Sequence, residues 1–142
     1  MPLSLRGFVV HSDILSVAVT RCKADANISS LVGNKVFNYV TKDETPPYLR
    51  VQWSDSEDMQ DKDTGSQFIS GTLIFDYWTE TRGDKEVLDM INYITDEFHL
   101  QPLALTQGST NLLITRQSYN TFLEGDGLSR HGVITFNLLI ED

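Results

Sequence analysis

The stretch GLSRHGVITFNLLI, residues 127–140, decides the fold more than any other part of the chain. Its second half alternates between two sets of side chains, as a strand with one buried face does. The first set is the more apolar: Ile134, Phe136, Leu138 and Ile140. The residues just before it, Gly125 to Ser129, contain two glycines and are typical of a turn. The sequence therefore predicts a turn and then a long strand over residues 132–140.

Four more segments upstream have the composition of strands. Tyr48 to Trp53 alternates cleanly, and Phe68 to Thr79 is rich in aromatic and β-branched residues. Leu112 to Tyr119 is a fourth strand, and Val36 to Val40 is a short one. The sequence therefore predicts about five strands, most of them long.

Two main helices are expected beside these strands. Ser12 to Ala24 has apolar residues at spacings of three and four, with Ser12 as N-cap and Asp13 in the first turn. An earlier start of this helix stays open, since Leu3, Leu5 and Phe8 are also apolar. A short helical turn follows and ends at Gly33. The second main helix begins after Asp84, its expected N-cap, and has an apolar stripe. That stripe consists of Val87, Leu88, Ile91, Ile94 and Phe98.

The order of these elements is α-β-β-β-α-β-β. This order predicts an α+β fold with a mostly antiparallel sheet of about five strands and the two main helices packed on one face. The chain has 142 residues, and no linker divides it, so we expect residues 1–142 to form a single domain.

The charge of the chain limits its partners. It has 11 Lys and Arg against 20 Asp and Glu, a net charge of −9, and its basic residues do not cluster. Because binding to nucleic acid depends on cations that neutralise phosphates, sequence-independent DNA binding is disfavoured. No apolar run approaches the roughly 18 residues of a membrane helix, so we expect no membrane partner.

Residues 54–67 are predicted to form an acidic projecting loop. Five carboxylates crowd into its first part: Asp55, Glu57, Asp58, Asp61 and Asp63. Three interpretations stay open, namely a solvated tip, an arm that docks on a neighbouring subunit, and a calcium site. Calcium binds oxygen ligands of this kind, but the spacing does not match an EF-hand loop.

No catalytic constellation is visible, and we expect neither an enzyme nor a cofactor. There is no GxSxG, no phosphate-binding loop, and the three histidines, His11, His99 and His131, lie in unrelated contexts. The single cysteine, Cys22, has helical spacing among apolar neighbours. We interpret it as a core residue.

Several short motifs, in order, resemble the tail-completion proteins of long-tailed phages and of phage-derived gene transfer agents. They are Ala24-Asp25-Ala26, Leu31-Val32-Gly33, Val36-Phe37, Pro46-Pro47-Tyr48, Trp78, Gly83, Glu86-Val87, Asp126-Gly127 and Arg130-His131-Gly132. The resemblance covers roughly residues 12–140, and it leaves out the first eleven residues and the acidic segment.

The resemblance implies a structural virion protein, a subunit of a ring, usually a hexamer, at the head-proximal end of the tail tube. Such a ring ends tail polymerisation and joins the tail to the head. Its partners would be itself, the major tail tube protein and a head-completion or connector protein, with DNA passing through the lumen. We expect the protein to be assembled in the host cytoplasm and to reside in the neck of the virion.

Subunit contacts are expected from the five acidic residues of 54–67 and from Arg130 and His131. Two alternatives remain, a head-closure or other neck component, and a calcium-dependent binding module built on the acidic segment.

Overall fold

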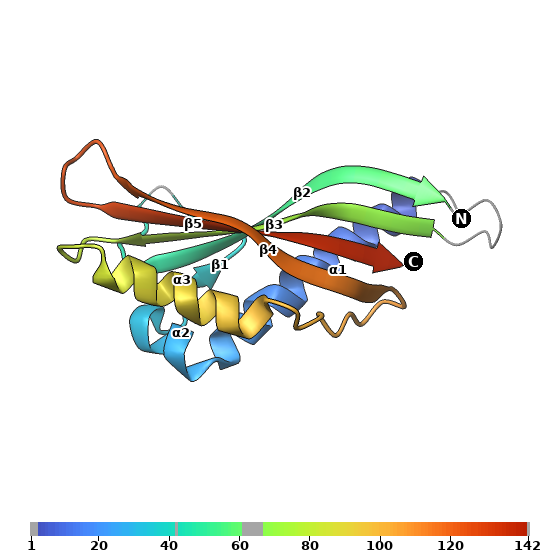
Figure 1. Cartoon of the computed structure of the whole chain (residues 1–142), viewed down its shortest axis with the longest axis horizontal. Coiled ribbons are helices and arrows are strands. Elements are labelled where there is room, and N and C mark those ends of the chain that lie inside the picture. Colours follow the sequence, from blue (N-terminus) through green and yellow to red (C-terminus); the bar gives the residue numbers. More distant parts are fainter. Residues whose placement is uncertain (1–2, 42, 61–66, 142) are drawn as a thin grey trace.

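The computed structural model describes residues 3–41, 43–60 and 67–141 (Figure 1). These residues form three helices and five strands. In order they are α1 (Leu3–Ala24), α2 (Ala26–Val32), β1 (Val36–Phe37), β2 (Tyr48–Gln60), β3 (Gln67–Thr79), α3 (Lys85–Phe98), β4 (Thr110–Leu123) and β5 (Arg130–Glu141). The predicted α+β class and the predicted order of the main elements are confirmed.

The five strands form one sheet in the order β1-β2-β3-β5-β4. Three of the four pairings are antiparallel, and only β1 pairs with β2 in parallel. The sheet is therefore mixed, although mostly antiparallel as predicted. The two outer strands differ greatly in length, since β1 has two residues and β4 has fourteen.

All three helices lie on one side of the sheet, and no helix of the described residues covers the other face (Figure 1). The cause is the alternation of the strands, which sends apolar side chains toward the helices and polar ones away. In β3, Leu73, Phe75 and Tyr77 are fully buried, and in β5, Ile134 and Phe136 are too. These are the faces that the alternating pattern predicted.

Aromatic rings occupy the centre of this core. The Phe75 ring lies 4.8 Å from that of Phe98 in α3 and 5.6 Å, edge-on, from that of Phe136 in β5. All three side chains are fully buried. Burying each one contributes about 2–3 kcal/mol, so α3 is held to the sheet mainly by apolar contact.

The acidic segment differs from its prediction. Residues 54–67 were expected to be a loop, but β2 continues to Gln60 and β3 begins at Gln67. The backbone of β2 finds hydrogen-bonding partners along the whole of the long apolar strand β3, and this overrides the weak strand propensity of acidic residues. A register shift between Asp55 and Glu57 accompanies the change in composition.

The start of α1 is the earlier of the two that the sequence left open. The helix begins at Leu3 rather than Ser12, so Asp13 lies in its interior and does not stabilise its first turn. The Asp13 carboxylate instead accepts hydrogen bonds from Thr106 N at 2.7 Å, Thr106 Oγ1 at 2.7 Å and Gln107 N at 3.2 Å. Asp13 therefore fastens the α3–β4 connection to α1.

The expected helix ends are met in part. Gly33 ends α2 with a φ of 62°, as predicted. Asp84 occupies the N-cap position of α3, but its side chain makes no capping hydrogen bond and binds Arg130 instead. The predicted strand 36–40 is confined to Val36 and Phe37.

Candidate functional site

The helix-free face of the sheet carries a polar cluster centred on Asp76 of β3. Only 4% of this residue is exposed. Its carboxylate accepts hydrogen bonds from Gln52 Nε2 at 2.6 Å and Arg50 Nη2 at 3.1 Å, both from β2. His131 of β5 approaches from the other neighbouring strand, with Nε2 2.8 Å from Asp76 Oδ1. Three strands therefore meet at one buried carboxylate.

Stacked rings flank this cluster. The rings of Trp78 and His131 are nearly parallel, at 10°, with centroids 4.3 Å apart. The Tyr48 ring lies 5.0 Å from Trp78, and the Arg50 guanidinium lies 4.9 Å above the same indole. Phe122 of β4 completes the row, 5.8 Å from His131. The row crosses four strands and restricts the access of water to the Asp76 cluster.

The surroundings of Asp76 favour its ionised form. Burial acts to raise the pKa of the carboxyl, but the hydrogen bonds from His131, Gln52 and Arg50 outweigh burial and hold the pKa below its ordinary value. Within the described residues, Arg50 Nε is buried and has no hydrogen-bond partner. The Asp76 carboxylate thus has its hydrogen-bond partners, whereas the Nε donor of Arg50 is unsatisfied among the described residues.

His131 also holds the β4–β5 turn. Its Nδ1 lies 3.1 Å from Glu124 Oε1, while its Nε2 is occupied by Asp76. The backbone of Glu124 pairs with that of Ser129 across the turn at 2.8 Å. His131 therefore links the turn to the centre of the sheet through two carboxylates, which is a structural role.

The turn itself is built on Asp126. Its carboxylate accepts hydrogen bonds from Ser129 N and Leu128 N, each at 2.8 Å, and from Ser129 Oγ at 2.7 Å. These bonds, chiefly that from the Ser129 backbone, lower the pKa of Asp126. Gly127 has a φ of 72°, a conformation that glycine adopts without strain. The Asp126-Gly127 motif is therefore turn chemistry.

Arg130 is bound within its own chain. Its Nη1 lies 2.6 Å from Asp84 Oδ1 and so joins the start of β5 to the start of α3. Both Arg130 and His131 are thus engaged in intramolecular pairs. That they also contact a neighbouring subunit stays a prediction.

The acidic candidates lie far from Arg130 and His131. Asp55, Glu57 and Asp58 belong to the outer half of β2, and their side chains, like all of Asp61 and Asp63, lie outside the described residues. Asp58 is level with Ile140 of β5, nine residues from His131, which corresponds to about 30 Å along a strand. Asp55, Glu57 and Asp58 therefore lie toward the opposite end of the sheet from Arg130 and His131.

Neither a metal site nor a reactive thiol emerges from the described part of the chain. It contains no group of three or more His, Cys, Asp or Glu side chains arranged to hold a metal ion. The calcium interpretation concerns acidic side chains outside that part. Cys22 is fully buried, and burial strongly raises the pKa of its thiol, so its predicted core role is confirmed.

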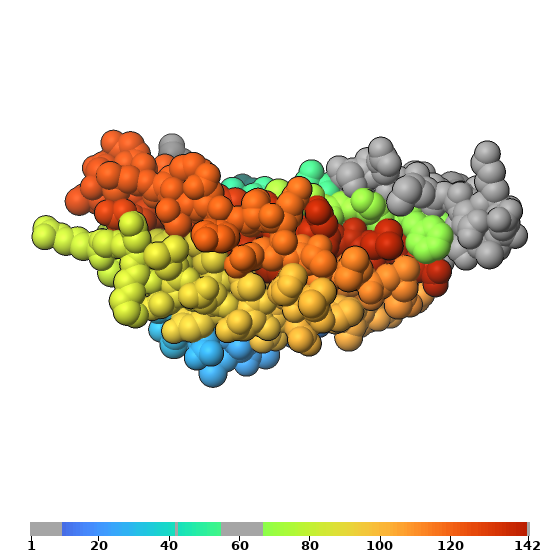
Figure 2. Space-filling model, in the orientation of Figure 1, coloured from blue at the N-terminus to red at the C-terminus, as the bar shows by residue number. Residues whose placement is uncertain are grey.

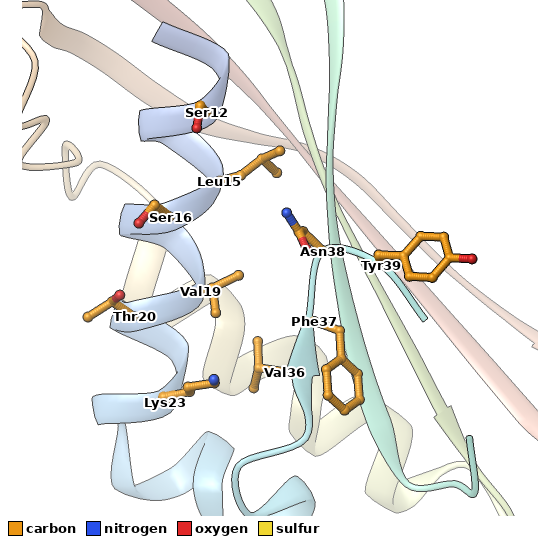
Figure 3. Close-up of a pocket in the computed structure, with 10 residues that line it drawn as sticks. All are labelled: Ser12, Leu15, Ser16, Val19, Thr20, Lys23, Val36, Phe37, Asn38 and Tyr39. Carbon is orange, nitrogen blue, oxygen red and sulfur yellow. The ribbon is translucent and has the colours of Figure 1, made fainter. Parts of the chain in front are cut away.

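A groove of about 380 Å³ lies between α1 and β1 (Figure 3). Leu15 and Val19 point from α1 toward the strands across it, whereas Tyr39 points away from α1. Hydroxyl groups and Lys23 line the rest of the groove beside these apolar side chains. The groove is on the helix side of the sheet, next to the short outer strand β1.

The opposite edge of the sheet is formed by β4. The segment after α3 covers the first half of this edge, where Leu100 N donates to Ile114 O at 2.8 Å and Arg116 N donates to His99 Nδ1 at 3.0 Å. From Gln117 to Leu123, no strand among the described residues pairs with the outer side of β4. Figure 2 shows β4 on the surface beside α3.

Sequence reasoning missed the Asp76 cluster. One signal was available, since Asp76 is a lone acid inside the apolar run LIFDYW, residues 73–78. A charge in such a run indicates a buried partner. Its partners Gln52 and His131 are 24 and 55 residues away, however, so only the strand register brings the three together.

Among the described residues, no helix is long and apolar enough to cross a membrane.

The chain is similar to a known protein family. The family model described as "Tail completion protein gp17" matches residues 18–141. No curated protein sequence was found to match the chain.

Two solved structures share the fold. One is a chain of the virion of the native gene transfer agent (GTA) particle, with a TM-score of 0.80 and 16% identity, over 92% of this chain and 96% of that chain. The other is the bacteriophage SPP1 gp17 protein, with a TM-score of 0.57 and 18% identity, over 91% of this chain and 89% of that chain. At these identities the likeness is one of fold.

Proposed function

Because the chain belongs to the tail completion protein gp17 family, it is a structural tail-completion protein of a phage-type virion, and we propose that it works as a ring of identical subunits. The ring would sit on the head-proximal end of the tail tube, end its polymerisation and join it to the head. Its partners would be the major tail tube protein on one side and a head-completion or connector protein on the other.

One observation supports the ring, namely that the two edges of the sheet differ in construction. β4 is long and exposes apolar side chains, whereas β1 is two residues long and borders a groove. Two different, complementary surfaces give head-to-tail contacts, which close into a ring when the rotation between subunits is right. A chain with one self-complementary surface would form a twofold dimer instead.

Mass photometry of the purified protein tests the ring directly. We expect a discrete species of several subunits, a hexamer by the family resemblance, and ring-shaped particles in negative stain. A protein that stays monomeric alone and also forms no ring on purified tail tubes would contradict the proposal. Twofold dimers would contradict it as well.

The acidic segment is proposed to reach the adjacent subunit or the tail tube. It lies at the far end of the long β2–β3 hairpin, and a projecting hairpin is a suitable arm for such a contact. Deleting residues 56–65 should weaken ring formation or attachment to tails. Unchanged assembly of this variant would refute the role of the arm and leave the ring proposal intact.

We also propose that acidic side chains line the lumen of the ring. The net charge of −9 motivates this, because acids repel DNA phosphates and let the DNA pass without binding. Electron cryomicroscopy of the ring would show Asp and Glu, including Glu124 or Asp126, on the inner surface. A lumen lined by Lys and Arg would overturn this part of the proposal.

A further inference from the structure

We propose that neighbouring subunits join through their sheets. The free half of β4 in one copy, Gln117–Leu123, would pair along β1 of the next copy, with helix-side residues of β4 entering the α1–β1 groove. This inference rests on the proposed ring and names the two surfaces that build it. The partner is a second copy of this chain.

The strand directions suit this contact. In the sheet, β2 and β5 run one way and β3 and β4 run the other, and β1 is parallel to β2. A lateral rotation from one subunit to the next preserves direction, so β4 would meet the next β1 antiparallel. Antiparallel pairing gives the more stable ladder, and it keeps every helix on the same side of the joined sheet.

The two surfaces also lie at the same level of the sheet. The strand register connects five Cα partners across it: Phe37, Arg50, Asp76, Val133 and Asn120. One residue further along, Asn38 is therefore level with Tyr119. Subunits related by rotation about an axis along the strands meet at equal levels, so the free half of β4 faces β1 and the groove beside it.

The side chains of β4 match the groove chemically. Tyr119 pairs with Ile134, which is buried under the helices, so Tyr119 points to the helix side of the sheet, where the groove lies. Leu123 follows four residues later on the same side. A tyrosine suits a groove lined by both apolar and polar side chains, because its ring packs while its hydroxyl finds a hydrogen-bond partner.

The composition of residues 117–123 indicates that a partner covers this edge of β4 and that it does not face solvent. Tyr119 is 52% exposed and Leu123 57% exposed. Residues 117–123, QSYNTFL, contain no proline and no charge. Monomeric proteins protect exposed edge strands with prolines and charged residues, because an unprotected edge recruits another strand. In the ring this edge would be covered.

Cysteine cross-linking tests the pairing. Residues directly opposite in an antiparallel pair have Cα atoms about 4.5–5.5 Å apart, within the span of a disulfide. The variant with both Asn38→Cys and Tyr119→Cys should give a ladder of covalent oligomers on oxidation, or with a short bismaleimide that tolerates a small shift in register. Cys22 does not compete, because it is fully buried.

The single variants are matched controls. N38C alone and Y119C alone should stay uncross-linked, and their mixture should give dimers and nothing larger. Rings in mass photometry without cross-links in the double variant would overturn the inference and leave the proposed ring standing. Dimers from a single variant would indicate a twofold contact and overturn it too. If no ring formed, either free or on tails, both the strand pairing and the proposed ring would be refuted.

A second variant probes the same surface without cysteines. L123D should raise the dissociation constant of the ring at least about tenfold, because it buries a charge in the contact. Leu128→Asp is the control, since Leu128 is 69% exposed and lies in the β4–β5 turn beyond the free edge. Thermal unfolding would show that both variants fold. A folded L123D that assembles as tightly as wild type would sink the inference.

Discussion

At the scale of single residues, buried polar groups specify how the strands meet. Asp76 receives three hydrogen bonds from two neighbouring strands, and each partner loses its counterpart if the carboxylate is removed. An unsatisfied buried group costs about 1–3 kcal/mol, which is a large part of the stability of a small domain. The cluster therefore favours one register of β2, β3 and β5 over others.

Replacing Asp76 by Asn should lower the free energy of unfolding by about 1–3 kcal/mol, because the neutral amide removes the buried charge that Arg50 pairs with and one of the acceptor oxygens of the cluster. Urea unfolding at pH 7 measures the effect. Asp96→Asn, on the exposed side of α3, is the control and should change little. An equal stability of D76N and wild type would contradict the structural role of the cluster.

The same carboxyl predicts a pH dependence. Its pKa in the folded protein lies below the unfolded value of about 3.9, so its stabilisation is complete above that value and is lost as pH falls through the folded-state pKa. The stability difference between wild type and D76N should therefore shrink as the pH falls below about 4. A difference that grew on acidification would refute this assignment.

At Gly132, from the Arg130-His131-Gly132 motif, α3 leaves no room for a side chain. A Cβ on Gly132 would lie 2.7 Å from Val87 Cγ1 of α3. Gly132→Ala should therefore destabilise the protein by about 1–3 kcal/mol, and adding Val87→Ala should recover part of that loss. Gly125→Ala is the control, since its Cβ meets open space. Additive effects of the two substitutions, measured by urea unfolding, would contradict a steric clash.

At the scale of elements, helices and strands are tied together by side chains that act at a distance in sequence. Arg21 of α1 donates to the carbonyls of Gln101 at 2.7 Å and Pro102 at 2.8 Å, and Asp13 binds Thr106 and Gln107. The α3–β4 connection is therefore held on α1 at both of its ends. Because this connection leads directly into β4, α1 also positions the outer strand.

Asp13→Ala should free this connection. Asp13 is 7% exposed and accepts three hydrogen bonds, so its loss should cost about 2–3 kcal/mol and increase amide exchange in residues 101–109. Hydrogen-exchange mass spectrometry measures the second effect. Ser12→Ala, exposed on the same helix, is the control. Unchanged exchange in D13A would show that other contacts hold the segment.

At the scale of the whole molecule, charge opposes assembly. Each subunit carries a net charge of −9, so bringing several together accumulates like charge, which salt screens. Residues 117–123 of β4 carry no charge and so form no ion pair with the α1–β1 groove, and screening should leave their attraction to it intact. Association of subunits should therefore strengthen with ionic strength.

Raising NaCl from 50 to 500 mM should lower the dissociation constant of the ring, as measured by mass photometry across a dilution series. Weaker assembly at high salt would contradict an apolar contact and would indicate that ion pairs between subunits dominate.

Much of the fold was predictable from the sequence, and the reason is local. Alternation in residues 132–140 and 68–79 reports which face of a strand is buried. Gly33 ends α2 because glycine adopts a positive φ without strain. Residues 54–60 were assigned wrongly to a loop, because their pairing depends on β3, and composition alone does not report a partner strand.

The sequence by itself determined the α+β class, the buried faces, the turn at Asp126-Gly127 and the core role of Cys22, since each depends on residues close in the chain. Only the tertiary structure decided that Asp76, His131 and Gln52 converge, that Arg130 binds Asp84, and that one half of β4 remains open opposite a groove. Strand order and register are cooperative properties of the whole sheet. They bring together residues that no local pattern connects.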